Sequence, residues 1–134
     1  MSGSILVIDD DEDDYTLIKD SFLEIGFSSP VYFAQSGAEG LRLLNELRPN
    51  IPILIILDLY MPAMNGMEVL KSIHDEFGIA VILYTALCTE EIIKKAKSAG
   101  ALDCIKKGTS YADNLRFAKH IVQLLPDLTS YPST

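Results

Sequence analysis

The sequence predicts a doubly wound α/β domain, with a five-stranded parallel sheet in the strand order 2-1-3-4-5. Five short apolar runs alternate with stretches whose apolar residues recur at helical spacing. The runs are almost continuously apolar, most clearly at residues 53–57, as expected for strands covered by helices on both faces. The 134 residues are enough for one such sheet and too few for two. We therefore expect a single domain over residues 1–134, with its core at about residues 4–125.

The expected strands contain mostly Ile, Val, Leu and aromatic residues, and an expected helix follows each one. The strands are residues 5–8, 31–34, 53–57, 80–84 and 102–105. The helices are expected around Leu17, Ile18, Phe22 and Ile25; Leu41, Leu44 and Leu47; Val69, Leu70 and Ile73; Ile92, Ile93 and Ala96; and Leu115, Ala118, Ile121, Val122 and Leu125. In this topology, functional residues should follow the first and third strands.

Residues typical of element boundaries support this division. They are Gly26, Gly78 and Gly100 near expected helix ends, Ser36, Thr89 and Ser110 near expected helix starts, and Pro49 and Pro52 before the third strand. Residues 126–134 lack periodicity and contain two prolines, so we expect a flexible tail there.

The composition argues against several classes of protein. A formal net charge of −8 disfavours binding to nucleic acid, because that binding depends on Lys and Arg. Two cysteines are too few for a disulfide framework and suit a reducing compartment. The sequence shows neither a basic, apolar leader nor a membrane-spanning run, so we expect a soluble, cytoplasmic protein without membrane contact.

Three carboxylates are expected to meet at one edge of the sheet. Asp9 and Asp10 end the first strand and Asp58 ends the third. Clustered carboxylates repel each other unless a cation lies among them, which favours a hard divalent metal such as Mg²⁺ or Mn²⁺. Asp58 follows a fully apolar strand, and a carboxylate at such a position is expected to be paired with a cation or to have a functional role.

Another explanation applies to part of the acidic run at residues 9–14. Carboxylates at the start of a helix complement its dipole and cap its free amide groups. This explanation is preferred for residues 11–14. For Asp9 and Asp10, which stand at the strand end, both explanations stay open.

A hydroxyl and an ammonium group are expected at the same edge. Thr85 ends the fourth strand, and Lys106 and Lys107 follow the fifth. Taken alone, the threonine is explained by its preference for strands and each lysine by a solvated position. Together with the carboxylates and a metal they suit phosphoryl transfer, in which a carboxylate oxygen attacks while cations stabilise charge on the transferred oxygens.

In this order and spacing, the motifs resemble the receiver domains of the bacterial two-component response-regulator family, over about residues 4–125. The matching stretches are Ile-Leu-Val-Ile-Asp9-Asp10-Asp; Leu-Asp58-Leu-Tyr-Met61-Pro62-Ala-Met-Asn65-Gly66; Tyr-Thr85-Ala86; and Ala99-Gly100-Ala101 with Lys107 six residues on. The resemblance implies a flavodoxin-like (βα)5 receiver fold and a phosphoprotein of phosphorelay signal transduction.

By this resemblance Asp58 would be the phosphoacceptor and would carry the phosphoryl group as an aspartyl phosphate. Asp10 and Asp58 would bind the metal directly, Asp9 would assist through water, and the Tyr60 backbone carbonyl would be a further ligand.

Thr85 and Lys107 would hold the phosphoryl oxygens. Lys107 stands at the family position, and of two neighbours on a strand only one, Lys106 or Lys107, can reach a given face. Pro62 and Gly66 would shape the loop after the third strand, because proline fixes φ and glycine adopts conformations closed to other residues.

Two positions depart from the family pattern. Gly108 follows Lys107 where most receivers have a proline after a cis peptide bond. A cis bond before a non-proline residue costs about 3 kcal/mol, so we expect this turn to have changed shape or to retain strain. Cys104 replaces an aromatic residue that usually swings inward with the threonine. We hypothesise that Thr85 still moves and that the helix near residues 89–98 is rebiased.

The resemblance implies a signalling domain and not an enzyme, although the domain would assist its own phosphorylation and dephosphorylation. The donor would be a histidine kinase or a histidine phosphotransfer protein. The chain ends just after the fifth helix, so we expect a stand-alone domain whose output passes to a protein partner or a homodimer through helix 4, strand 5 and helix 5. Tyr111, Phe117 and Ile121 are candidates for that surface, although core positions would explain them as well.

Two other functions are weighed against this one. A Mg²⁺-dependent phosphohydrolase with an aspartyl-phosphate intermediate would use the same nucleophile, but such enzymes usually carry an acidic residue two positions later, where this chain has Tyr60. A flavodoxin-like cofactor binder needs a phosphate-binding loop after the first strand, whereas residues 9–14 would repel phosphate without a metal. Tyr60 and Leu87 would flank the path of attacking water, and we hypothesise that they slow hydrolysis of the phosphoryl group.

Overall fold

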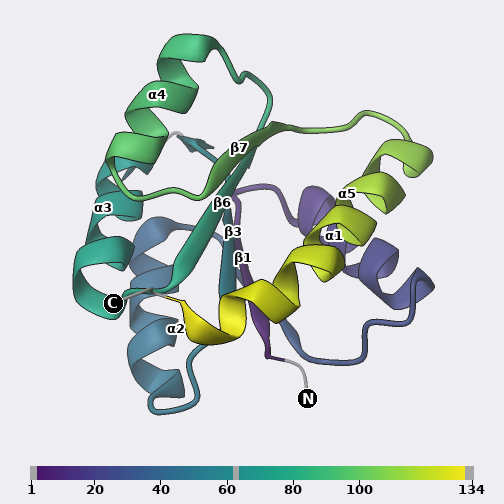
Figure 1. The fold of residues 1–134 in the computed structure, drawn as a ribbon, viewed down its shortest axis with the longest axis horizontal. Helices are drawn as coiled ribbons and strands as arrows, with labels where there is room; N and C mark the ends of the chain where they lie inside the picture. The colour runs from purple at the N-terminus through teal and green to yellow at the C-terminus, as the bar shows by residue number, and fades with distance from the viewer. Residues whose placement is uncertain (1–2, 62–63, 132–134) are drawn as a thin grey trace.

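The computed structural model describes residues 3–61 and 64–131. Within them, one sheet of five parallel strands has the order β2-β1-β3-β6-β7. The strands are β1 (Ile5–Ile8), β2 (Val31–Ala34), β3 (Leu54–Leu57), β6 (Ala80–Thr85) and β7 (Asp103–Lys106). Numbered along the chain as five strands, this is the order 2-1-3-4-5, so the predicted doubly wound, flavodoxin-like fold is confirmed (Figure 1).

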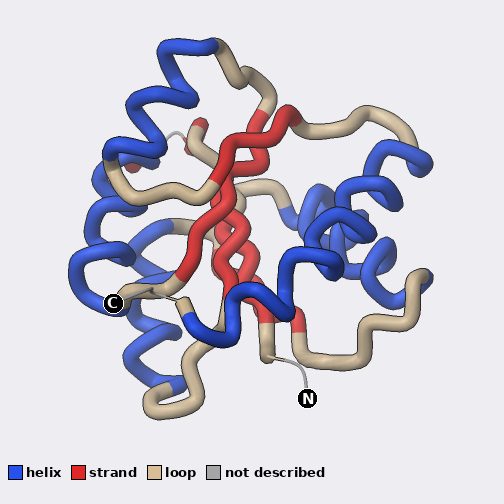
Figure 2. The backbone as a smooth tube through the Cα atoms, viewed as in Figure 1, coloured by secondary structure: helices blue, strands red, loops and turns tan. Residues whose placement is uncertain are grey.

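Helices cover both faces of the sheet, as Figure 1 and Figure 2 show. On one face lie α1 (Glu12–Glu24) and α5 (Tyr111–Leu124), and on the other lie α2 (Gly37–Leu47), α3 (Gly66–Phe77) and α4 (Glu90–Ser98). Successive strand residues point to opposite faces, so each strand contributes to two cores. Every residue of β3 is buried, as its continuous apolar sequence predicts.

None of the helices in the described part of the chain combines the length and the apolar character needed to cross a lipid bilayer.

The register of the sheet brings the strand ends together. Ile8 of β1 lies beside Leu57 of β3, which lies beside Leu83 of β6. The backbone N–H of Asp58 donates to the Ile8 carbonyl at 2.9 Å. The residues that follow β1 and β3 therefore leave the sheet at the same edge.

The helix boundaries follow the expected capping residues. Hydroxyl groups accept hydrogen bonds from backbone N–H groups at three helix starts, and these belong to Ser36, Thr89 and Ser110. Glycines with positive φ follow three helices, and these are Gly26, Gly78 and Gly100. The serine and threonine caps and the left-handed glycines explain why the boundaries could be placed from the sequence.

A short antiparallel hairpin that was not predicted lies between β3 and α3. It consists of β4 (Tyr60–Met61) and β5 (Met64–Asn65), with Tyr60 opposite Asn65. Strands of two residues are too short to show a hydrophobic period. Pro62, which was expected to shape this loop, lies outside the described residues.

Gly66 has a different role from the one expected. Its φ is not positive, so conformational freedom does not explain the glycine. A Cβ at this position would instead overlap the carbonyl oxygen and Cα of Leu59. The glycine allows the start of α3 to approach the backbone that follows β3.

The tail expected from residue 126 onward is corrected in part. A 3-10 helix, η1 (Leu125–Ser130), continues from α5. Leu125 and Leu128 are three residues apart, as a 3-10 helix requires for a shared face, and both are buried in the core beside α1 and α5. Pro126 is tolerated because it occupies the first turn.

We predict that Gly66→Ala lowers the free energy of unfolding by about 1–3 kcal/mol, because the added methyl group forces the backbone at Leu59 to shift. Urea unfolding followed by circular dichroism measures this. Glu68→Ala, at an exposed position of the same helix, is the control and should change stability by less than about 0.5 kcal/mol. Equal stabilities of the two variants would contradict the close approach.

Candidate functional site

Asp58 lies at the centre of a polar cluster at the edge of the sheet. The residue directly follows β3 and is 7% exposed. Its Oδ1 accepts hydrogen bonds from the Tyr60 backbone N–H at 3.1 Å and from the Thr85 hydroxyl at 3.0 Å. Its Oδ2 contacts the Lys107 ammonium at 3.2 Å. The buried carboxylate is thus compensated by three donors from separate segments.

Asp9 and Asp10 adjoin Asp58, as expected from the strand order. One carboxylate oxygen from each of the three residues lies within 4.8 Å of the others. Asp9 is 2% exposed, whereas Asp10 faces solvent. Burial raises the pKa of Asp9 to about 6, although hydrogen bonds from Lys107 and the Asp11 backbone oppose this shift. Burial therefore makes the ionised form of Asp9 costly, and the hydrogen bonds from Lys107 and the Asp11 backbone offset only part of that cost.

Lys107 supplies the positive charge in this cluster. Its Nζ lies 2.7 Å from Asp9, 2.6 Å from Asp14 and 3.2 Å from Asp58. Burial lowers the pKa of the ammonium, but hydrogen bonds with Asp14 and Asp9 outweigh this, so the pKa is raised overall. The backbone N–H of Lys107 donates to the Thr85 carbonyl at 2.7 Å, which fixes the start of its side chain. Lys106, in contrast, is exposed.

Asp14 is a site residue that the sequence reasoning missed. It was assigned with residues 11–14 to the start of a helix, and Asp11 does cap α1 by accepting from the Asp13 N–H. Asp14 nevertheless reaches Lys107 from the first turn of α1. In the sequence Asp14 appears only as an acidic residue in the first turn of a helix. Acidic residues at that position are also expected when they merely stabilise the helix start, so the sequence did not single out Asp14.

The turn after Lys107 has changed shape, one of the two outcomes expected from the missing proline. The Lys107–Gly108 peptide bond is trans. The Gly108 N–H donates to the Tyr84 hydroxyl at 3.0 Å, and that hydroxyl donates to Asn114 Oδ1 at 2.9 Å. A Cβ at Gly108 would overlap the side chain of Asp113. A tyrosine and a glycine therefore hold this turn without a proline.

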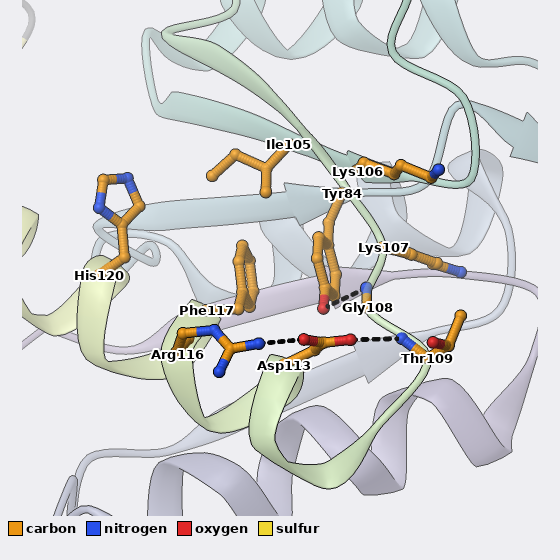
Figure 3. A pocket seen from close by; sticks show the side chains of 10 residues that line it. All are labelled: Tyr84, Ile105, Lys106, Lys107, Gly108, Thr109, Asp113, Arg116, Phe117 and His120. Atoms are coloured by element: carbon orange, nitrogen blue, oxygen red, sulfur yellow. Dashed lines mark hydrogen bonds and ion pairs between the residues drawn. The ribbon is translucent and has the colours of Figure 1, made fainter.

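A pocket of about 500 Å³ lies beside this turn, between β7 and α5 (Figure 3). Tyr84 and Phe117 stack on each other in its wall, with ring centroids 3.7 Å apart. Asp113 accepts from the Thr109 N–H and pairs with Arg116. The pocket thus shares Lys107 with the polar cluster.

Two of the three residues proposed for the output surface are buried, so that part of the prediction is wrong. Tyr111 is 60% exposed, but Phe117 is 5% and Ile121 0% exposed. Both buried residues lie on the face of α5 that packs against the sheet, where they belong to the core. Tyr111 alone of the three is available for contact with a partner.

A family model described as response regulator receiver domain matches residues 5–117. The chain belongs to this family. Sporulation initiation phosphotransferase F of Bacillus subtilis is 33% identical over 104 residues, which are 76% of this receiver and 79% of that protein. A protein-glutamate methylesterase/protein-glutamine glutaminase of Lawsonia intracellularis is 32% identical over 114 residues, 84% of this chain. The receiver spans only 29% of that enzyme's length.

A solved structure supports the same fold. The phosphorylated cyanobacterial phytochrome response regulator RcpA superimposes with a TM-score of 0.85 at 22% identity, covering 99% of this chain and all of that one. This likeness confirms the fold. The family model and the sequence relatives confirm the response-regulator and two-component assignments made from the motifs.

The donor set of this receiver suits a hard divalent cation. Asp9, Asp10 and Asp58 offer carboxylate oxygens close enough together to share one ion, and Mg²⁺ and Mn²⁺ prefer such ligands. A cation bound there would also reduce the repulsion between the three carboxylates.

We predict that Mg²⁺ stabilises the folded protein, by about 2.7 kcal/mol at a concentration about 100 times its dissociation constant. Asp10→Asn should lose most of this stabilisation because a cluster oxygen loses its charge. Thermal unfolding with increasing Mg²⁺ measures it. Asp13→Asn is the matched control, since Asp13 is exposed in the same acidic run but outside the cluster. An equal loss in both variants would indicate charge screening instead of a site.

Proposed function

We propose that Asp58 is a phosphoacceptor, loaded by a histidine kinase or a histidine phosphotransfer protein. The observation that carries this proposal is a buried carboxylate held by a hydroxyl and an ammonium beside two further carboxylates. The family assignment supports it, because the matched segment includes every residue of this cluster.

The residues of the cluster divide the chemistry between them. An oxygen of Asp58 attacks phosphorus in line with the leaving imidazole of the donor histidine, so the O–P bond of an aspartyl phosphate forms as the P–N bond to that imidazole breaks. The Lys107 ammonium and the Thr85 hydroxyl, which now donate hydrogen bonds to Asp58, are placed to donate to the phosphoryl oxygens instead. Their charge and hydrogen bonds stabilise the negative charge of the transferred group.

A divalent cation, Mg²⁺ or Mn²⁺, completes the proposed site. Asp10, Asp58 and the Tyr60 backbone carbonyl would hold it directly, and Asp9 through water, which agrees with the clustering of the three carboxylates. When bound, the ion neutralises charge on the phosphoryl oxygens and on the carboxylates. The protein side chains orient the acceptor and shield it from bulk water.

The conformational switch begins with a change of partners. The phosphoryl group adds nearly two negative charges, so Lys107 is drawn from its carboxylates and Thr85 from Asp58. Thr85 ends β6, and the loop after it leads to α4. We therefore propose that phosphorylation shifts the conformational equilibrium of α4. Unchanged amide chemical shifts in α4 on phosphorylation would count against this.

The proposed role is that of a cytoplasmic signalling domain and not of an enzyme with an external substrate. Output would pass to a protein partner or a second copy through α4, β7 and α5, where Tyr111 is exposed. Tyr60 argues against a phosphohydrolase, because such enzymes usually carry an acidic residue at this position, two residues after the nucleophile.

We predict that the protein gains one phosphoryl group from acetyl phosphate in the presence of Mg²⁺, and none when the metal is chelated. Intact-mass analysis measures this. Asp58→Asn should abolish the gain, because an amide oxygen is a poor nucleophile. Asp75→Asn, which removes an exposed acid on α3, should be modified like the wild type. A wild type that gains no mass, or an Asp58→Asn variant that still does, would refute the assignment.

We also predict that Tyr60 and Leu87 prolong the life of the aspartyl phosphate. Their side chains are 47% and 52% exposed and follow Asp58 and Thr85 by two residues. The double variant Tyr60→Ala, Leu87→Ala should lose the phosphoryl group several-fold faster, because water gains access. Leu23→Ala, an exposed leucine of α1, should decay like the wild type. A wild-type lifetime of only seconds would remove the hypothesis.

A further inference from the structure

Two free cysteines from separate segments meet beneath α4. Cys88 lies in the loop between β6 and α4, and Cys104 lies in β7. Their Sγ atoms are 2.7 Å apart. The sulfurs of a disulfide lie about 2.0 Å apart, so a movement of less than an ångström would join them. The pair is therefore placed to form an intramolecular bond.

The surroundings give the two thiols different access to solvent. Cys104 is 7% exposed and belongs to the core under α4, whereas Cys88 is only partly buried and packs against that core. Burial raises the pKa of the Cys104 thiol to about 12, and the neighbouring Cys88 adds to the shift. Cys88 is the thiol that an oxidant meets first, and Cys104 is the thiol placed to resolve the product.

We propose that Cys88 and Cys104 form a reversible disulfide when the protein meets a hydroperoxide. In the first step the Cys88 sulfur attacks the peroxide, an S–O bond forms and the O–O bond breaks, and the thiol proton leaves with the displaced alcohol or water. In the second step the Cys104 sulfur attacks the Cys88 sulfenic acid. The S–S bond forms, the S–O bond breaks, and hydroxide leaves with the Cys104 proton as water. Two electrons pass from the sulfurs to the peroxide.

The bridge would connect the loop after β6 to β7, close to the two proposed phosphoryl-binding groups, Thr85 and Lys107. Cys88 follows Thr85 by three residues, and Cys104 precedes Lys107 by three. Leu83 and Cys104 are register partners, so the bridge would tie the loop after β6 back to the adjacent strand. This consequence rests on the proposed function: the bond would restrict the loop through which the movement of Thr85 reaches α4.

The test uses the full chain and hydrogen peroxide as the probe. After oxidation the protein is unfolded and treated with a thiol-alkylating reagent, and its intact mass is measured. The expected product has lost about 2 Da, for two hydrogens, and carries no alkyl group. Dithiothreitol should restore two alkylated thiols. Cys88→Ser and Cys104→Ser are matched controls, and neither can form the internal bond.

Three results would overturn the proposal. They are alkylation of both thiols after oxidation, a disulfide-linked dimer on a non-reducing gel, or a gain of oxygen at Cys88 without a bridge. None of these results depends on phosphorylation, so a failure here is distinct from a failure of the phosphoacceptor assignment.

Hydrogen exchange tests the mechanical consequence. Amides of residues 86–92 should exchange about ten-fold more slowly in the oxidised protein and recover on reduction. A bridged protein in which these amides exchange at the reduced rate would show that the bond does not restrain the loop.

Discussion

The structure depends on one electrostatic arrangement, a single ammonium held among carboxylates at the edge of a parallel sheet. Lys107 contacts Asp9, Asp14 and Asp58, and two of these acids are almost completely buried. Carboxylates in such surroundings need a cation close by. Because strands β1 and β3 end in register, the fold forces the acids together, and the residue that follows β7 brings the compensating charge.

The same arrangement explains why the cluster can act as a switch. Both carboxylate oxygens of Asp58 have partners in the unmodified protein, with the Thr85 hydroxyl on one oxygen and the Lys107 ammonium on the other. A new anionic group must take these partners from the carboxylates. The hydrogen bonds and ion pairs lost by the carboxylates are thus replaced by new ones to the phosphoryl group. The rigid sheet limits the resulting movement to the loops that follow the strands.

Much of the fold and of the cluster could be predicted from the sequence, because both rest on strong local signals. Continuous apolar strands, capping hydroxyls and left-handed glycines located the elements, and polar residues after buried strands located Asp58 and Thr85. The failures have physical causes. Asp14 looks in the sequence like any acidic residue at a helix start, although it pairs with Lys107. Strands of two residues are too short to show a hydrophobic period. Gly66 is required because the Leu59 backbone leaves no room for a Cβ, and a sequence does not show such a contact. Phe117 lies four residues before Ile121 and so shares its helix face, which packs against the sheet, and the helical spacing already indicated that face for Ile121.

The hydroxyl of Tyr84 joins the turn that carries Lys107 to Asn114 on α5, and its ring stacks on Phe117 of the same helix. A molecule that occupied the pocket between β7 and α5 would therefore press on the backbone from which the site ammonium extends (Figure 3). Binding free energies at two coupled sites are reciprocal. If such a molecule altered the contacts of Lys107, metal binding at the acidic cluster would alter the affinity for that molecule by the same free energy.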